Sequence, residues 1–149
     1  MTNNRFVLFI VESEVLLIEI DKDNYAIRQI IVDKQGEIHL SCFEDCLAEG
    51  TIMEDEISSN GIFISKSEFN FIWNKAIKCN ESNWINNKIK YPIGTVVTAI
   101  CKYFYPQGAI LKGKNYTALY VGNKEIAINQ IVSFTVINYD DVNMWLITK

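Results

Sequence analysis

Short runs of apolar and β-branched residues, separated by turn-forming residues, recur along the whole chain. In the first half these runs are residues 5–11, 15–20, 25–32 and 37–42. The segments between them are rich in Asp, Asn, Glu and Gly, which fold back on their own backbone or accept a positive φ. Four short strands at this regular spacing predict an antiparallel β-meander.

The clearest local motif starts a helix at Ser65-Lys66-Ser67-Glu68. The Ser65 hydroxyl can accept a hydrogen bond from the Glu68 amide, while the Glu68 carboxylate reaches back to the Ser65 N–H, which is a capping box. Apolar residues then recur at the spacing of one helix face: Phe69, Ile72, Trp73, Ala76 and Ile77. The pattern predicts an amphipathic helix over about 66–79 whose aromatic stripe packs on the core.

The segments around this helix carry weaker patterns. Residues 43–60 are expected to hold one short helical turn and an irregular, strongly acidic loop, and residues 61–64 a brief strand. Residues 80–90 are polar apart from Trp84, Ile85 and Ile89. We interpret them as a linker or half-strand.

The second half predicts a small barrel of five strands. A long β-branched and aromatic run ends at Tyr105-Pro106-Gln107-Gly108, where proline presets the first turn position and glycine accepts a positive φ. The expected strands are 94–104, 109–111, 116–121, 130–138 and 144–148. Turn residues separate each strand from the next.

This strand order resembles the OB-fold of the ribosomal S-one type, an RNA-binding family. The matching motifs are Gly94-Thr95-Val96-Val97, Gly108-Ala109-Ile110-Leu111, and Phe134-Thr135-Val136-Ile137-Asn138-Tyr139-Asp140 followed by Trp145-Leu146-Ile147. The resemblance covers the last two fifths of the chain and implies an OB-type barrel. The base-stacking aromatics of the family are missing, because Gln107 and Ile110 occupy their positions, and Val121 stands where the family commonly has histidine.

These patterns together predict a mainly β (α+β) chain. Residues 1–90 would form an acidic β-meander with the helix at about 66–79, and residues 91–149 an S-one-like OB barrel. An apolar share of 49% is ample for a buried core, so we expect the two parts to form one compact unit.

Compartment is predicted from what the sequence lacks. No apolar run approaches the length of a bilayer span, and the Met-Thr-Asn-Asn start has no basic region followed by an apolar core. A domain of this size can fold without disulfides, which favours reduced thiols at Cys42, Cys46, Cys79 and Cys101. We expect a cytoplasmic protein without an export signal or membrane anchor.

No catalytic constellation is visible in the sequence. His39 is the only histidine, and nothing in its spacing requires a nucleophilic pair with a cysteine. There is also no glycine-rich phosphate loop and no zinc-protease motif. We expect no enzymatic activity and no cofactor. Zinc binding by His39, Cys42, Cys46 and Cys79 stays open, because imidazole and thiolates suit tetrahedral zinc.

Charge is distributed unevenly along the chain, whose formal net charge is −4. From Tyr91 onward the sequence has five lysines and three carboxylates, a net charge of +2, so residues 1–90 carry a net charge of −6. The segment from Glu12 to Glu56 has thirteen carboxylates and three basic residues, a net charge of −10. A surface of this kind repels phosphates and attracts cationic proteins.

The first functional hypothesis is therefore a non-enzymatic acidic protein-binding module. It would act as a bacterial immunity-type or antitoxin-type inhibitor that neutralises a basic toxin, such as a nuclease, by direct binding. A dense anionic face accelerates encounter with such a partner. The candidate partner-binding residues are Glu12, Glu14, Glu44, Asp45, Glu49, Glu54, Asp55 and Glu56.

The alternative hypothesis is an RNA-binding protein of translation or RNA metabolism. Lysines and tyrosines alternate on the basic barrel half and could replace the missing stacking platform. These residues are Lys102, Tyr103, Tyr105, Lys112, Lys114, Tyr116 and Tyr120. A third possibility is a subunit whose apolar edge strands complete a partner's sheet.

Overall fold

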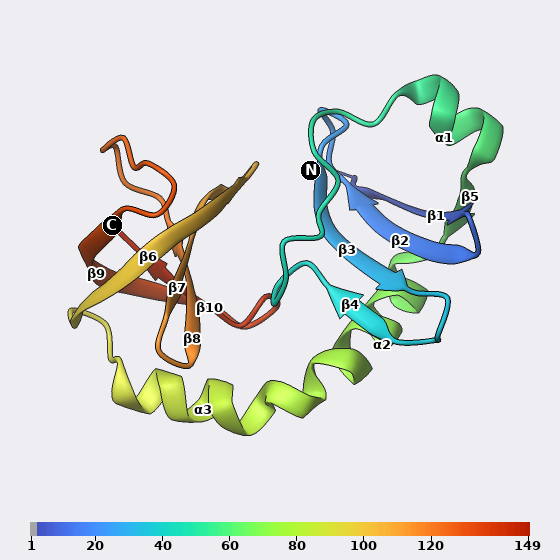
Figure 1. Cartoon of the computed structure of the whole chain (residues 1–149). Helices are drawn as coiled ribbons and strands as arrows, with labels where there is room; N and C mark the ends of the chain where they lie inside the picture. Colours follow the sequence, from blue (N-terminus) through green and yellow to red (C-terminus); the bar gives the residue numbers. More distant parts are fainter. Residues whose placement is uncertain (1–2) are drawn as a thin grey trace. The chain divides into compact units, whose positions relative to one another are not determined.

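Ten β-strands and three α-helices make up the computed structural model, which describes residues 3–149 (Figure 1). The mainly β fold class is confirmed, with a five-stranded antiparallel sheet in the first half and a ring of five strands in the second. The chain divides into two compact units between Ile77 and Lys78. The sequence predicts a division at 90/91, so residues 78–90 belong to unit 2 in this division.

Unit 1 is built on the predicted meander. The strands β1 (Arg5–Val11), β2 (Glu14–Ile20), β3 (Ala26–Val32) and β4 (Ile38–Leu40) lie side by side, and β5 (Ile62–Ile64) pairs with the free edge of β1. The sheet order is β4-β3-β2-β1-β5. The strand predicted at 37–42 is shorter than expected, because the chain turns after Leu40.

The acidic segment before β5 contains a helix where a single helical turn in a loop was expected. Helix α1 (Glu54–Asn60) has three carboxylates in its first turn and one buried side chain, Ile57. Negative side chains near a helix N-terminus interact favourably with the helix dipole. The acidity that obscured this helix in the sequence therefore stabilises it.

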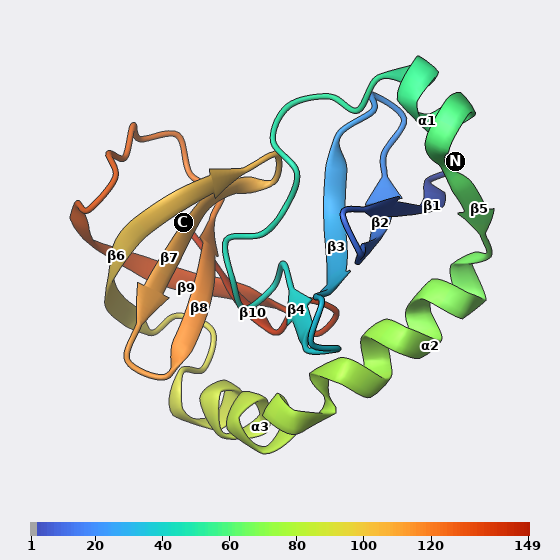
Figure 2. The same ribbon diagram turned by 45° about the vertical axis from the view of Figure 1, so that its right-hand side comes forward.

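Helix α2 (Lys66–Ile77) begins at the predicted capping box and continues directly from β5 (Figure 2). The Glu68 amide donates to the Ser65 hydroxyl at 3.0 Å, and the Ser65 amide donates to the Glu68 carboxylate at 3.2 Å. The predicted end at about Cys79 is slightly late, since α2 ends at Ile77 and residues 78–80 form a separate 3-10 turn.

The aromatic stripe of α2 packs on the sheet of unit 1 and covers a buried ion pair there. The ring centroid of Phe69 lies 5.2 Å from that of Phe6 and 6.0 Å from that of Trp73. The Arg28 guanidinium lies over both α2 rings, at 4.8 and 5.1 Å, and donates to the carboxylate of Glu19 on the neighbouring strand. Arg28 and Glu19 are each only 7% exposed. The helix thus covers a charged pair as well as an apolar face.

Unit 2 is a closed barrel preceded by a helix. Its elements are η1 (Lys78–Asn80), α3 (Glu81–Lys90), β6 (Val96–Tyr105), β7 (Gly108–Gly113), β8 (Tyr116–Tyr120), β9 (Ile131–Asp140) and β10 (Trp145–Thr148). The ring runs β10-β8-β7-β6-β9, and β10 pairs with β8 in parallel while the other pairs are antiparallel. This closed five-stranded ring is consistent with an OB-type barrel.

Residues 81–90 form α3 instead of the expected linker or half-strand. The buried indole of Trp84 donates to the Asp141 carboxylate at 2.8 Å, and the side-chain amides of Asn83 and Asn87 donate to the Asn115 carbonyl at 3.0 and 2.9 Å. The packed face of α3 consists mainly of one tryptophan and two amides, so few apolar residues mark the helix in the sequence. Within residues 3–149, no helix has the length and apolar content needed to cross a bilayer.

The buried pair of unit 1 predicts a large difference between single and double substitutions. Arg28→Met leaves the Glu19 carboxylate buried without its guanidinium, which costs about 3–5 kcal/mol of unfolding free energy. Arg28→Met combined with Glu19→Leu should recover most of this loss, because no uncompensated charge remains. Urea unfolding of the full chain measures each variant.

The exposed pair Arg5–Glu54 provides the matched control, with N and O atoms 2.8 Å apart and an exposed carboxylate. Arg5→Met should cost no more than about 1 kcal/mol. Equal losses for Arg5→Met and Arg28→Met would contradict the importance of the buried pair.

Candidate functional site

The carboxylates of unit 1 gather at the two opposite ends of its sheet. The α1 end, where β1 starts and β2 meets β3, carries Asp21, Asp23, Glu54, Asp55 and Glu56. The hairpin end, which holds the β1–β2 and β3–β4 turns, carries Glu12, Glu14, Asp33, Glu37, Glu44 and Asp45. A seven-residue strand separates the two ends by about 20 Å.

A network of polar contacts holds the α1 end together. Arg5 donates to the Asn24 side chain at 2.7 Å and pairs with Glu54 at 2.8 Å, and Asn24 also donates to Glu54 at 3.3 Å. The Arg5 guanidinium holds the pKa of the Glu54 carboxyl below its ordinary value. The two neighbouring helix carboxylates, Asp55 and Glu56, are exposed.

At the hairpin end, the imidazole of His39 lies between two carboxylates. Its Nε2 is 2.8 Å from Asp33 Oδ2, and its Nδ1 is 2.8 Å from Glu44 Oε2. Hydrogen bonds to Asp33 and then to Glu44 raise the pKa of His39, while the bond to His39 lowers the pKa of Asp33. The structure therefore favours the charged pair of imidazolium and carboxylate.

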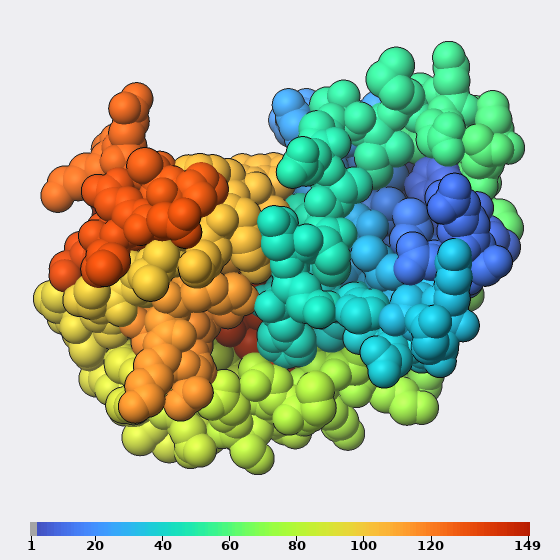
Figure 3. Space-filling model, in the orientation of Figure 1, coloured from blue at the N-terminus to red at the C-terminus, as the bar shows by residue number. Residues whose placement is uncertain are grey.

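The eight predicted partner-binding acids do not form one face. Seven of them are exposed, and Glu14 is half-buried. Three of the eight lie at the α1 end and four at the hairpin end, while Glu49 lies in the connecting segment. Part of the chain between β4 and α1 is visible on the surface of unit 1 (Figure 3), while Ser41, Cys42 and Leu47 in it are buried. The expectation of one anionic face is replaced by two anionic ends.

The cysteine-based zinc site left open by the sequence has little support in the geometry. Among the described residues, the cluster of possible metal ligands that contains His39 holds Asp33 and Glu37 and no cysteine. Burial, followed by the charges of Glu44 and Asp45, raises the pKa of the Cys46 thiol to about 12. A protonated thiol is neither a zinc ligand nor a nucleophile.

Most of the predicted RNA-stacking tyrosines are core residues of unit 2. Tyr105, Tyr116 and Tyr120 are each 8% exposed. The Tyr116 hydroxyl donates to the Thr98 carbonyl at 2.9 Å. The half-buried ring of Tyr103 lies 5.0 Å from that of Tyr105 and 5.8 Å from the ammonium of Lys112. Of the seven predicted RNA-binding residues, only Lys102 and Lys114 are exposed.

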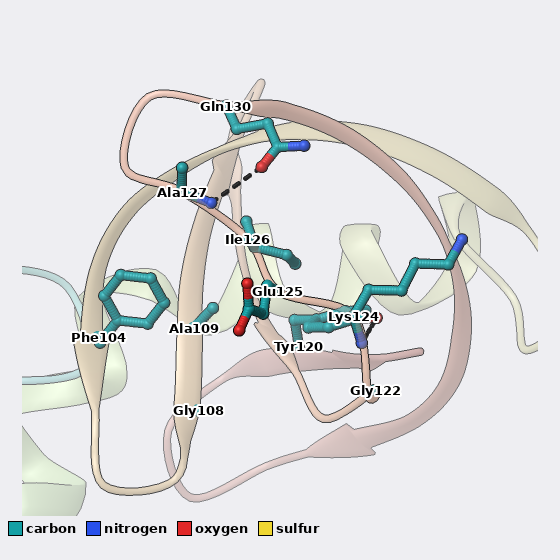
Figure 4. A pocket seen from close by; sticks show the side chains of 10 residues that line it. All are labelled: Phe104, Gly108, Ala109, Tyr120, Gly122, Lys124, Glu125, Ile126, Ala127 and Gln130. Carbon is teal, nitrogen blue, oxygen red and sulfur yellow. Dashed lines mark hydrogen bonds between the residues drawn. The ribbon is translucent and has the colours of Figure 1, made fainter.

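A pocket of about 560 Å³ lies in unit 2 between β6, β7 and the 122–130 segment (Figure 4). Phe104, Tyr120 and Ile126 supply apolar surface, and Lys124 and Glu125 supply charge. Sequence reasoning missed Phe104, whose ring is 52% exposed. Phe104 lies two residues after the exposed Lys102, on the same outward side of β6, and this alternation along the strand could have identified it.

The two units differ more in net charge when the chain is divided between Ile77 and Lys78 than when it is divided at 90/91. Residues 1–77 carry fourteen carboxylates against six basic residues, a net charge of −8, and residues 78–149 carry eight lysines against four carboxylates, a net charge of +4.

No protein-family model matches the chain, and comparison with characterised proteins finds no match.

The contacts of His39 predict a pH dependence of stability. The pKa of His39 is raised from 6.5, so its contribution is complete below about pH 6.5 and is lost as the pH rises through the raised value. The pKa of Asp33 is lowered from 3.8, so its contribution is lost as the pH falls through the lowered value. The pair stabilises most between these limits.

Urea unfolding in the presence of EDTA should show a loss of stability as the pH rises above 6.5 that His39→Gln lacks. Asp21→Asn is the matched control, because Asp21 accepts from the amides of Asp23 and Tyr25 as Asp33 accepts from those of Gln35 and Glu37, yet no contact joins Asp21 to His39. Identical pH profiles for the wild type and His39→Gln would contradict the ion pair.

Proposed function

We propose that this protein is a non-enzymatic binding module that recognises a basic protein through unit 1. The observation that carries the proposal is the net charge of −8 on a 77-residue unit, with carboxylates concentrated at its strand ends. An immunity-type or antitoxin-type inhibitor of a bacterial toxin, such as a basic nuclease, has these requirements. It needs a rigid scaffold and an anionic surface, and it needs no catalytic group.

The α1 end is the better docking surface of the two. At the hairpin end, the charges of Asp33 and Glu44 are partly compensated by contact with His39. At the α1 end, Asp55 and Glu56 are exposed on a helix whose contacts with β1 hold it against the sheet. Exposed carboxylates on a fixed helix can meet lysine or arginine side chains without a large ordering cost.

Titration against the purified product of the neighbouring gene, or against a basic ribonuclease, tests the proposal. We expect a 1:1 complex whose affinity falls steeply with salt. Asp55→Asn combined with Glu56→Gln should weaken binding about two- to thirtyfold, because each exposed charge contributes about 0.2–1 kcal/mol.

Glu81→Gln serves as the control, since this exposed carboxylate lies in the first turn of α3 in unit 2. Its affinity should equal that of the wild type. A complex that is insensitive to salt, or equally weakened by the control, would remove the proposal, as would the absence of any complex.

RNA binding by unit 2 is the second candidate function, and the net charge of +4 on this unit favours it. The exposed ring of Phe104 and the ammonium groups of Lys102 and Lys124 replace the predicted tyrosines as the candidate contacts. An exposed ring beside cationic groups can stack on a base while the lysines contact phosphates.

Filter binding of single-stranded RNA at low salt measures this activity. If unit 2 binds RNA, Phe104→Ala should weaken retention about tenfold, because one stacked base contributes about 1–3 kcal/mol. Lys75→Ala, an exposed substitution in unit 1, is the control. Retention that responds to neither Phe104→Ala nor Lys102→Ala would exclude this surface.

A further inference from the structure

The hairpin between β3 and β4 brings two classes of metal-binding side chain together. Asp33, Glu37 and His39 each direct one ligand atom into a cluster in which all of these atoms lie within 4.8 Å of one another. The set combines one imidazole nitrogen with two carboxylate oxygens. All three residues come from one seven-residue stretch of backbone, so folding of the hairpin is sufficient to assemble it.

The turn itself orients Asp33. Its Oδ1 accepts hydrogen bonds from the backbone amides of Gln35 and Glu37, both at 2.9 Å. The second oxygen, Oδ2, is thereby directed toward His39 Nε2. Asp33 is thus a ligand whose position is largely determined before any ion arrives, which lowers the cost of binding.

Glu44 orients His39 from outside the hairpin. Its carboxylate lies 2.8 Å from Nδ1, which must carry a proton to bridge the two atoms. Metal-binding histidines commonly donate one ring N–H to a carboxylate while the other nitrogen binds the ion. With Nδ1 protonated, Nε2 faces an anionic oxygen at 2.8 Å and requires a cation there. A proton on Nε2 satisfies that requirement at 2.8 Å, and a metal ion satisfies it once the two atoms move apart to about 3.3 Å.

We propose that Asp33, Glu37 and His39 bind a divalent transition-metal cation such as Zn²⁺, with Glu44 as the residue that orients the imidazole. Tetrahedral zinc with bonds of about 2.0–2.1 Å separates its ligand atoms by about 3.3 Å, so small side-chain movements suffice. Water occupies the remaining coordination position. The exposed Glu37 and the partly exposed His39 leave the site accessible from solvent.

The ligand set discriminates between metal ions. An imidazole nitrogen suits zinc and its first-row neighbours, whereas Ca²⁺ and Mg²⁺ prefer oxygen ligands throughout. This site differs from the cysteine-based set considered from the sequence, because it uses carboxylates in place of thiols. It also lies wholly within unit 1.

Calorimetric titration of the full chain with Zn²⁺ tests the proposal. A Cys79→Ser background removes an exposed competing thiol. We expect one site with micromolar affinity and weaker binding of Ca²⁺ and Mg²⁺. Asp33→Asn should weaken zinc binding at least tenfold, and Glu44→Ala about 10- to 100-fold, the usual effect of losing an orienting carboxylate.

Asp21→Asn is again the matched control. It makes the same change in an equivalent turn without a neighbouring imidazole, so its zinc affinity should stay within twofold of the background. Because His39 is the only histidine, its ring nitrogens give an unambiguous NMR signature, and the Nε2 resonance should shift on zinc addition while Nδ1 stays protonated.

Three results would overturn the site. The first is the absence of zinc binding. The second is equal affinity for Asp33→Asn and Asp21→Asn. The third is Ca²⁺ or Mg²⁺ binding as tight as that of Zn²⁺, which would exclude the imidazole as a ligand.

Discussion

The contact on which unit 1 most depends is the buried pair of Arg28 and Glu19 beneath the aromatic rings of α2. A charge removed from water requires a partner, and Arg28 has several, since Glu19, Asn70 and the rings of Phe69 and Trp73 all contact it. The planar guanidinium, with donors on several nitrogens, suits this combination of hydrogen bonds to two side chains and stacking on two rings better than an ammonium would. The pair therefore specifies how α2 lies on the sheet, beyond what apolar contact alone would select.

The same sheet determines where charge can accumulate. Its faces are covered by helices and by the segment after β4, so carboxylates are excluded from them except in the paired Glu19. They concentrate instead in the turns and in the first turn of α1, at the two strand ends. Unit 2 has the opposite net charge, and its candidate contacts lie on outward-facing positions of β6 and, for Lys124, in the 122–130 segment. The two functional candidates thus belong to different units with different electrostatics.

Two turns of unit 1 show how neighbours determine what a carboxylate can do. Asp21 and Asp33 each follow a strand and accept the backbone amides two and four residues later. Their local roles are the same. Only Asp33 lies beside an imidazole, because β4 pairs with β3 and places His39 across from Ile31. Strand pairing therefore makes an ordinary turn residue part of the proposed metal site.

The sequence by itself determined the meander, the capping box with α2, and the five strands of the barrel, because these depend on local periodicity and turn chemistry. It did not reveal α3, whose docking relies on the Trp84 indole and on asparagine amides that bond to distant groups. Nor did it reveal the burial of three predicted tyrosines, the separation of the acids into two ends, or the approach of Glu44 to His39. These features were decided by tertiary structure, because each depends on which strands pair and which side chains the packed core leaves at the surface.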